Sequence, residues 1–76
     1  MKSPKLGHLQ RSVLDLASKH EGLVWAALVL EEIYGYSADA TPPVATRNTV
    51  SRVLWSLEKR GLLEKAPEVR GFRLSN

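Results

Sequence analysis

Asn48 and Arg52 are the two side chains of this 76-residue chain whose types and spacing best suit recognition of a specific partner. They are four residues apart, so a helix would place them one turn apart on the same face. An asparagine amide can form two hydrogen bonds with adenine, and an arginine guanidinium can form two with guanine. The pair therefore suits a surface that reads the edges of base pairs; the alternative is that Asn48 only caps the helix or fills its surface.

Short hydroxyl side chains and cations flank this pair in the same segment. Hydroxyl groups, arginine, lysine and the positive N-terminal end of a helix all suit contacts with phosphate. The segment thus combines groups that read sequence with groups that hold a nucleic-acid backbone. We predict DNA contacts from Thr46, Arg47, Asn48, Thr49, Ser51, Arg52, Ser56 and Lys59.

The sequence predicts a helix over residues 46–60 that would position these side chains. Thr46 is expected to cap its N-terminus, and Gly61 follows its C-terminus. Apolar residues recur at steps of three and four, as one buried helix face requires: Val50, Val53, Leu54 and Leu57. Because a helix turns about 100° per residue, burial of that stripe leaves four side chains outward: Asn48, Arg52, Trp55 and Lys59.

Two further helices are predicted before this one. Ser3 and Pro4 suit the start of a helix over residues 5–20. A second helix is expected over residues 26–34, and it stops at Gly35. The apolar residues 23–25 between the two form either a helical turn or a short strand, and we favour a strand that pairs with the C-terminal hairpin.

Residues 62–75 predict that hairpin, because two alternating segments flank a loop that begins at Pro67. Two strands alone are not stable in water, so the hairpin is expected to pack on the helices. Arg70 falls at or near its tip and Arg73 on its second strand. Either these cations face a partner, or Glu64 and Glu68 neutralise the hairpin locally.

The run Thr49 to Leu63, TVSRVLWSLEKRGLL, resembles the recognition helix and first wing strand of small winged-helix transcription regulators of prokaryotic type. The resemblance implies an α+β winged-helix fold over residues 1–76, a single domain of three helices with a helix-turn-helix and a C-terminal two-stranded wing. It also implies that the helix 46–60 enters the major groove. Arg70 and Arg73 of the wing would then contact phosphate or the minor groove.

The charge distribution favours the same kind of partner. The net charge is +3, but residues 1–45 hold four basic and five acidic residues, and residues 46–76 hold seven basic and three acidic. The C-terminal part therefore carries +4 against −1 for the rest, which suits a polyanion.

Two tryptophans leave alternatives open. Trp55 departs from the family pattern, where a polar residue is usual, and we expect it to pack under the hairpin against Phe72 or Val69. A protein contact and stacking on an unpaired base are the other options. If residues 23–34 were entirely helical, Val24, Trp25 and Leu28 would form an exposed apolar patch.

Catalysis, cofactors and metals find little support. The chain has no cysteine, its two histidines both fall in the first predicted helix, and no glycine-rich phosphate loop is present. A metal site of Asp15, His20 and Glu21 is only a weak possibility. The longest apolar run has eight residues, too short for a membrane span. No small-molecule ligand is evident, and we expect a cytoplasmic protein, nucleoid-associated if prokaryotic.

The sequence is therefore interpreted as a non-enzymatic regulator that binds double-stranded DNA sequence-specifically. A homodimer is expected, because one module of this size covers little DNA surface. The alternative is a winged-helix module for protein–protein contact through the region of Trp25 or Trp55. Binding of single-stranded DNA or RNA through Trp55 and Phe72 is a third hypothesis.

Overall fold

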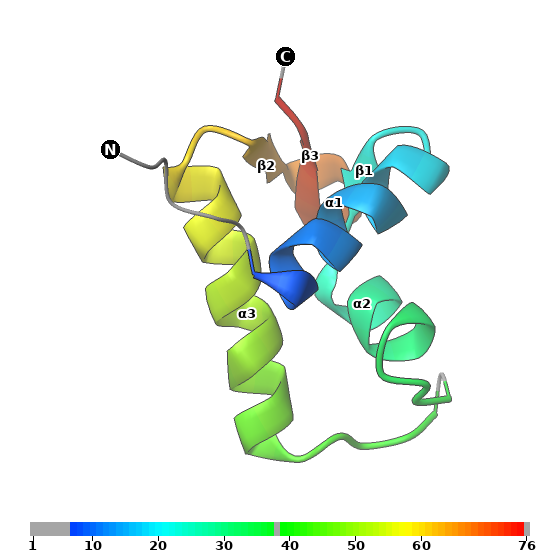
Figure 1. Ribbon diagram of the computed structural model, residues 1–76. Helices are drawn as coiled ribbons and strands as arrows, with labels where there is room; N and C mark the ends of the chain where they lie inside the picture. The colour runs from blue at the N-terminus through cyan, green and yellow to red at the C-terminus, as the bar shows by residue number, and fades with distance from the viewer. Residues whose placement is uncertain (1–6, 38, 76) are drawn as a thin grey trace.

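The structure is a computed structural model that describes residues 7–37 and 39–75. It contains three helices and a three-stranded antiparallel sheet, so the chain is of the α+β class (Figure 1). The elements in chain order are α1 (His8–Lys19), β1 (Leu23–Val24), α2 (Ala26–Glu32), α3 (Val44–Lys59), β2 (Leu63–Ala66), the 3₁₀ turn η1 (Pro67–Val69) and β3 (Gly71–Leu74).

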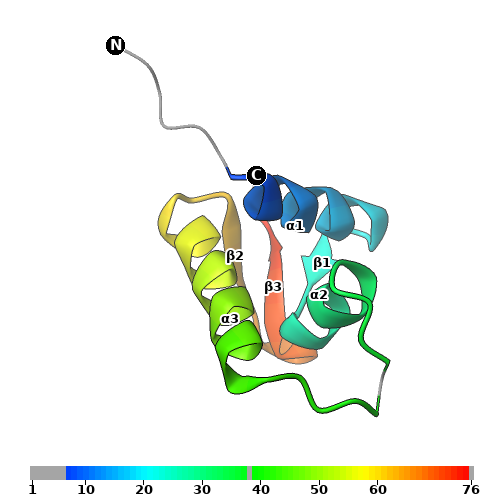
Figure 2. The same ribbon diagram turned by 60° about the horizontal axis from the view of Figure 1, so that its bottom comes forward.

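The last strand lies at the centre of the sheet, which has the order β1-β3-β2. Figure 2 shows β2 and β3 between α3 on one side and β1 and α2 on the other. Helix α1 contacts α3, β1 and β3, and α3 contacts both α2 and β2. Every described helix therefore helps to cover one small core. No helix in the described ranges has the length and apolar composition needed to cross a membrane.

The core is apolar throughout, and no polar or charged residue among those described is buried. Aliphatic side chains are an efficient filling for so small a volume, because they have no polar atoms that need partners. The largest fully buried side chains come from all three helices and from β1 and β2: Val13, Val24, Val29, Val50, Leu57 and Leu63.

The start of α1 is only partly open to comparison with the sequence. The cap expected at Ser3 and Pro4 lies outside the described residues, as does the start predicted at residue 5. Within them, α1 begins after Gly7, whose backbone N–H donates to the Gln10 side chain over 2.9 Å. The helix ends where Gly22, at φ +83°, donates to the carbonyl of Ala17, as the sequence predicts.

Helix α3 begins two residues before the predicted start, and the cap assigned to Thr46 is wrong. The N-cap is Pro43, in an extended conformation, and Thr46 lies half-buried in the first turn. Proline has no N–H to donate to a helical hydrogen bond. It is therefore tolerated at the start of a helix but not in the interior. The first two helical positions, Val44 and Ala45, do not extend the apolar stripe of α3, so the periodicity could not predict that the helix begins there.

The C-terminus of α3 has the predicted glycine end. The N–H of Gly61 donates to the carbonyl of Glu58, and the N–H of Leu62 donates to that of Leu57, both over 3.0 Å. This pair of hydrogen bonds with Gly61 at φ +79° is a Schellman motif. It turns the chain directly from α3 into β2.

Residues 23–24 form a strand, which confirms the pairing with the hairpin and excludes the helical turn. Leu23 pairs with Arg73 and Val24 with Phe72 across β1 and β3. Val24 and Leu28 are buried, so the exposed patch that a continuous helix would have produced does not exist. Trp25 is half-buried at the N-cap of α2, which ends at Glu32, two residues before the predicted end.

Gly71 permits this close approach of β1 to β3. A Cβ at this position would lie against the backbone carbonyl of Val24 and 2.7 Å from the Cβ of Trp25. The hairpin itself pairs Leu63 with Leu74 and Ala66 with Gly71. The sequence therefore predicted the hairpin correctly, and the glycine explains how a third strand fits beside it.

Candidate functional site

The outer face of α3 carries the side chains predicted to point away from the core. Asn48, Arg52, Trp55 and Lys59 are all exposed, while Val50, Leu54 and Leu57 are buried. Arg47, Thr49 and Ser51 are exposed as well. The predicted division of this helix into a buried and an outward face is confirmed.

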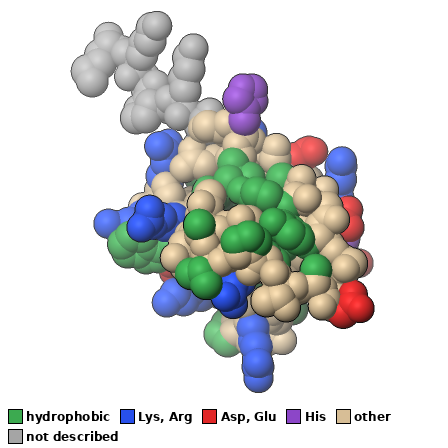
Figure 3. Space-filling view, turned by 90° about the horizontal axis from the view of Figure 1, so that it is seen from below, with side chains coloured by type: hydrophobic (Ala, Val, Ile, Leu, Met, Phe, Trp, Pro, Cys, Tyr) green, Lys and Arg blue, Asp and Glu red, His purple; other side chains and the backbone are tan. Residues whose placement is uncertain are grey.

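The N-terminal half of this face borders a hollow between α2 and α3. Its volume is about 390 Å³, and its apolar part comes from Ala26 and Leu30 of α2 and from Val44. Arg47, Asn48 and Ser51 supply the polar part. Figure 3 views the molecule from below, the side of the α2–α3 connection, with hydrophobic side chains near the centre and cations along the left and lower margins. This end of α3 thus offers hydrogen-bonding groups beside apolar surface.

Val44 belongs to this surface, although sequence reasoning missed it. Its side chain is 60% exposed at the first position of α3. It occurs four residues before Asn48, a spacing that places both on one face of the helix. The early start of α3 brings it there, so only a correct helix boundary could have revealed it.

The C-terminal half of the face is dominated by Trp55, which is 57% exposed. The expectation that it packs under the hairpin is wrong. Trp55 follows the buried Leu54 by about 100° around the helix axis, which turns the indole toward the outer face of α3. Instead, the Lys59 ammonium lies 4.7 Å from the centre of the indole ring.

Two hydroxyl residues of the predicted set form hydrogen bonds within the protein. Ser56 is half-buried and accepts a hydrogen bond over 3.1 Å from the Gln10 amide of α1. The Thr49 hydroxyl donates to the carbonyl of Ala45, one turn earlier. Together with the half-buried Thr46, these residues lie at the margin of the outer face rather than at its centre.

The two hairpin arginines differ in their surroundings. The Nε of Arg73 lies 3.1 Å from a Glu64 carboxylate oxygen, and its Nη1 lies 3.6 Å from one of Glu68. Arg70 follows η1 in the left-handed region, at φ +53°, and is exposed. In the described part of the chain it has no ion pair. The local neutralisation considered for the hairpin thus describes Arg73 and leaves the charge of Arg70 available.

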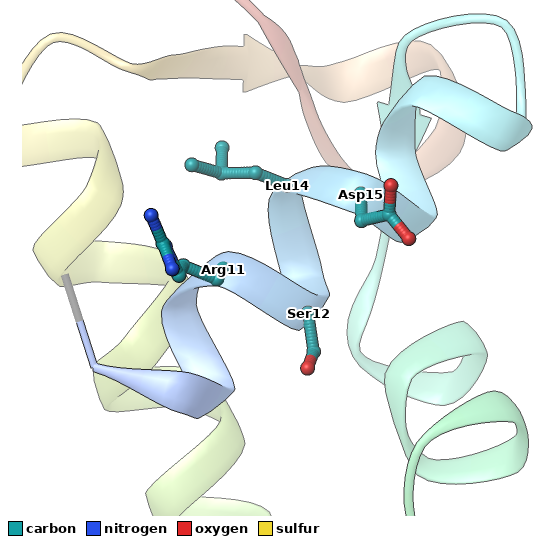
Figure 4. A pocket seen from close by; sticks show the side chains of 4 residues that line it. All are labelled: Arg11, Ser12, Leu14 and Asp15. Carbon is teal, nitrogen blue, oxygen red and sulfur yellow. The ribbon is translucent and has the colours of Figure 1, made fainter.

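A second hollow, of about 560 Å³, lies along α1, but the polar side chains that line it do not converge on one point. Arg11, Ser12, Leu14 and Asp15 line it, and their side chains leave the helix in different directions (Figure 4). Asp15 instead lies 3.5 Å from Lys19 in an exposed ion pair. Within residues 7–37 and 39–75, no three histidine, cysteine, aspartate or glutamate side chains lie together as metal ligands would.

Comparison of the chain with protein-family models, with curated proteins and with solved structures found no match.

Proposed function

We propose that this chain is a winged-helix domain of a small transcription regulator that binds double-stranded DNA sequence-specifically. The observation that carries the proposal is the outer face of α3. Its exposed positions hold three cations, Arg47, Arg52 and Lys59, and the one acidic residue of α3, Glu58, is half-buried. Asn48 lies on the same face, one turn before Arg52.

The order of the elements supports the proposal. Three helices followed by a C-terminal hairpin are compatible with the winged-helix arrangement that the resemblance of residues 49–63 implies. The connection of α2 to α3, residues 33–43, is longer than the turn of about three or four residues in a compact helix-turn-helix, so the support comes from the order of the elements and not from this turn. Helix α3 and the hairpin β2–β3, called the wing from here on, are the two surfaces assigned to DNA.

Each surface has a separate role in this proposal. Asn48 and Arg52 enter the major groove and bond base edges, while Arg47 and Ser51 hold the adjacent phosphates. Arg70 reaches the backbone or the minor groove from the wing. Arg73 stays with its two carboxylates and fixes the shape of the wing.

Titration with duplexes of random sequence over a range of salt concentrations tests the proposal. With about four to six phosphates contacted per protomer, the logarithm of the binding constant should fall with that of the salt concentration at a slope of about −4 to −5. Arg11→Ala is the matched control, since Arg11 is an exposed cation of α1 outside the proposed surfaces. Failure to bind at 50 mM salt (about the lower end of the usual range), or a slope near zero, contradicts the proposal.

The dimer and the cytoplasmic location remain part of this proposal. One module buries only about 600–1,000 Å² of protein surface on DNA, which favours a second copy on an adjacent half-site. Selection of duplexes from a random pool checks this, because a palindrome gives the symmetry and the half-site spacing together.

A protein–protein module is the second candidate, and the exposure of Trp55 favours it. The Trp25 region has less exposed apolar surface for a protein contact, since its neighbours Val24 and Leu28 are buried. Phe72, half-buried in the sheet opposite Val24, is equally ill placed to stack on a single-stranded base. Amide shifts on addition of duplex separate the candidates: changes confined to α3 and the wing support DNA binding, and an unchanged α3 contradicts it.

A further inference from the structure

Trp55 is the one large aromatic side chain on the outer face of α3, and its exposure requires an explanation. It follows Ser51 by four residues and Asn48 by seven, so all three share one face of the helix. More than half of its surface is open, although tryptophan is a residue that proteins usually cover. A partner that binds this face therefore meets the indole ring.

The contact with Lys59 restricts what that partner can be. The ammonium lies 4.7 Å from the ring centre, within the range of a cation–π interaction. Arg52 occurs three residues before Trp55 and is exposed on the same helix. An apolar protein groove that received the ring would also have to strip water from these cations without pairing them, whereas a nucleic-acid strand would neutralise them.

The position of the pair along α3 suggests where on DNA it would bind. Given a rise of 1.5 Å per residue, Trp55 lies about 10 Å and Lys59 about 16 Å along the axis from Asn48. The major groove is about 12 Å wide. If the N-terminal half of α3 points into the groove and Asn48 reaches the bases, the C-terminal half crosses the groove edge, where sugars and phosphates run.

We propose, resting on the DNA binding proposed above, that Trp55 and Lys59 form one unit that binds the sugar–phosphate strand at the edge of the groove. The Lys59 ammonium pairs with a phosphate, and the exposed part of the indole packs against the adjacent deoxyribose. Trp55 is a positioning residue for Lys59, because the ring holds the ammonium of a flexible side chain in one place before DNA arrives.

Four variants test this unit: Lys59→Ala, Trp55→Leu, Trp55→Phe and the double variant Lys59→Ala with Trp55→Leu. Lys59→Ala should weaken duplex binding about threefold to tenfold and reduce the magnitude of the salt slope by about one. Trp55→Leu keeps an apolar side chain but removes the ring, so it should lower the affinity and reduce the slope in the same direction. Trp55→Phe retains a weaker aromatic face and should keep most of the slope. The double variant should bind about as well as the weaker single one.

A fluorescence titration adds a direct readout. In a Trp25→Phe background, with circular dichroism to check folding, Trp55 is the only tryptophan. Its emission should shift or be quenched when duplex is added, and stay constant when the protein alone is concentrated.

The outcomes separate this inference from the function beneath it. If the wild-type chain binds no duplex, both the Trp55–Lys59 unit and the proposed DNA binding are contradicted. If it binds, but Trp55→Leu leaves affinity and salt slope unchanged, or the two substitutions act additively, the unit is contradicted and DNA binding stands. An emission change on concentrating the Trp25→Phe protein without DNA assigns the ring to a protein contact and overturns the inference.

Discussion

Gln10 of α1 and Ser56 of α3 are joined by a hydrogen bond of 3.1 Å between the amide nitrogen and the serine hydroxyl. The two residues are 46 positions apart in sequence, and the bond is partly buried between the helices. It ties α1 to α3 at the margin of the proposed DNA surface. Ser56 therefore helps to hold α3 against α1, whereas the exposed residues of α3 are the ones proposed to contact DNA.

Ser56→Ala should lower stability without a specific loss of DNA binding. The change removes the acceptor of the Gln10 amide, and a net loss of about 0.5–1.5 kcal/mol is typical of such a bond. Urea unfolding measures this loss. A duplex titration of the same variant should give the wild-type salt slope, and a slope reduced by one unit would instead place Ser56 on a phosphate.

Arg52→Ala should weaken binding to the preferred duplex and relax the sequence preference at one position. Loss of a bidentate contact to guanine costs about 1–3 kcal/mol of discrimination. Competition between the preferred duplex and single-base variants measures this. If every duplex loses the same affinity, Arg52 contacts the backbone and not a base.

Arg70→Asn should weaken all duplexes evenly and reduce the salt slope by about one. Asparagine is the matched substitution, because Arg70 is at φ +53° and asparagine tolerates the left-handed region. Thermal unfolding should therefore be close to wild type. Altered sequence preference in this variant would contradict a purely phosphate-directed role.

Glu68→Gln should strengthen duplex binding modestly. The substitution removes one of the two carboxylates beside Arg73 and leaves the closer one, Glu64, in place. Because these pairs are exposed, the stability loss should not exceed about 1 kcal/mol. Salt-dependent titration checks the prediction, and an affinity that stays the same or falls would show that the wing does not approach DNA on this side.

Gly71→Ala should destabilise the fold by about 1–3 kcal/mol, as other forced overpacking does. The added methyl group would press on the backbone of Val24 and the Cβ of Trp25, which cannot move without breaking the β1–β3 pairing. For a domain of this size each kcal/mol lowers the melting temperature by about 4–8 °C. An unchanged melting temperature would mean that β1 does not pack as closely as described.

Local patterns were sufficient to predict the faces of the elements. The spacing of Val50, Leu54 and Leu57 identifies the buried side of α3, and that alone places Asn48 and Arg52 outward. The glycine at position 61 likewise identifies the end of the helix. These features depend on residues within one or two turns, which is the range over which periodicity and capping act.

Contacts between distant segments could not be predicted in the same way. The start of α3 at Val44 depends on Pro43 rather than on a periodic residue. The ion pair of Arg73 with Glu64 exists because the register of β2 and β3 sets them directly opposite each other. Whether the hairpin covers Trp55 is also a contact between distant segments, and the 57% exposure of this residue shows that the expected packing does not form.

The central place of β3 makes assembly of the sheet wait for the last part of the described chain. Leu23 emerges during synthesis fifty residues before its partner Arg73, and β1 and β2 have no hydrogen-bonded contact with each other. Until β3 is made, β1 has an unsatisfied backbone edge and the helices lack one wall of their core. Closing so long a loop late is expected to slow folding relative to a purely helical domain of this length.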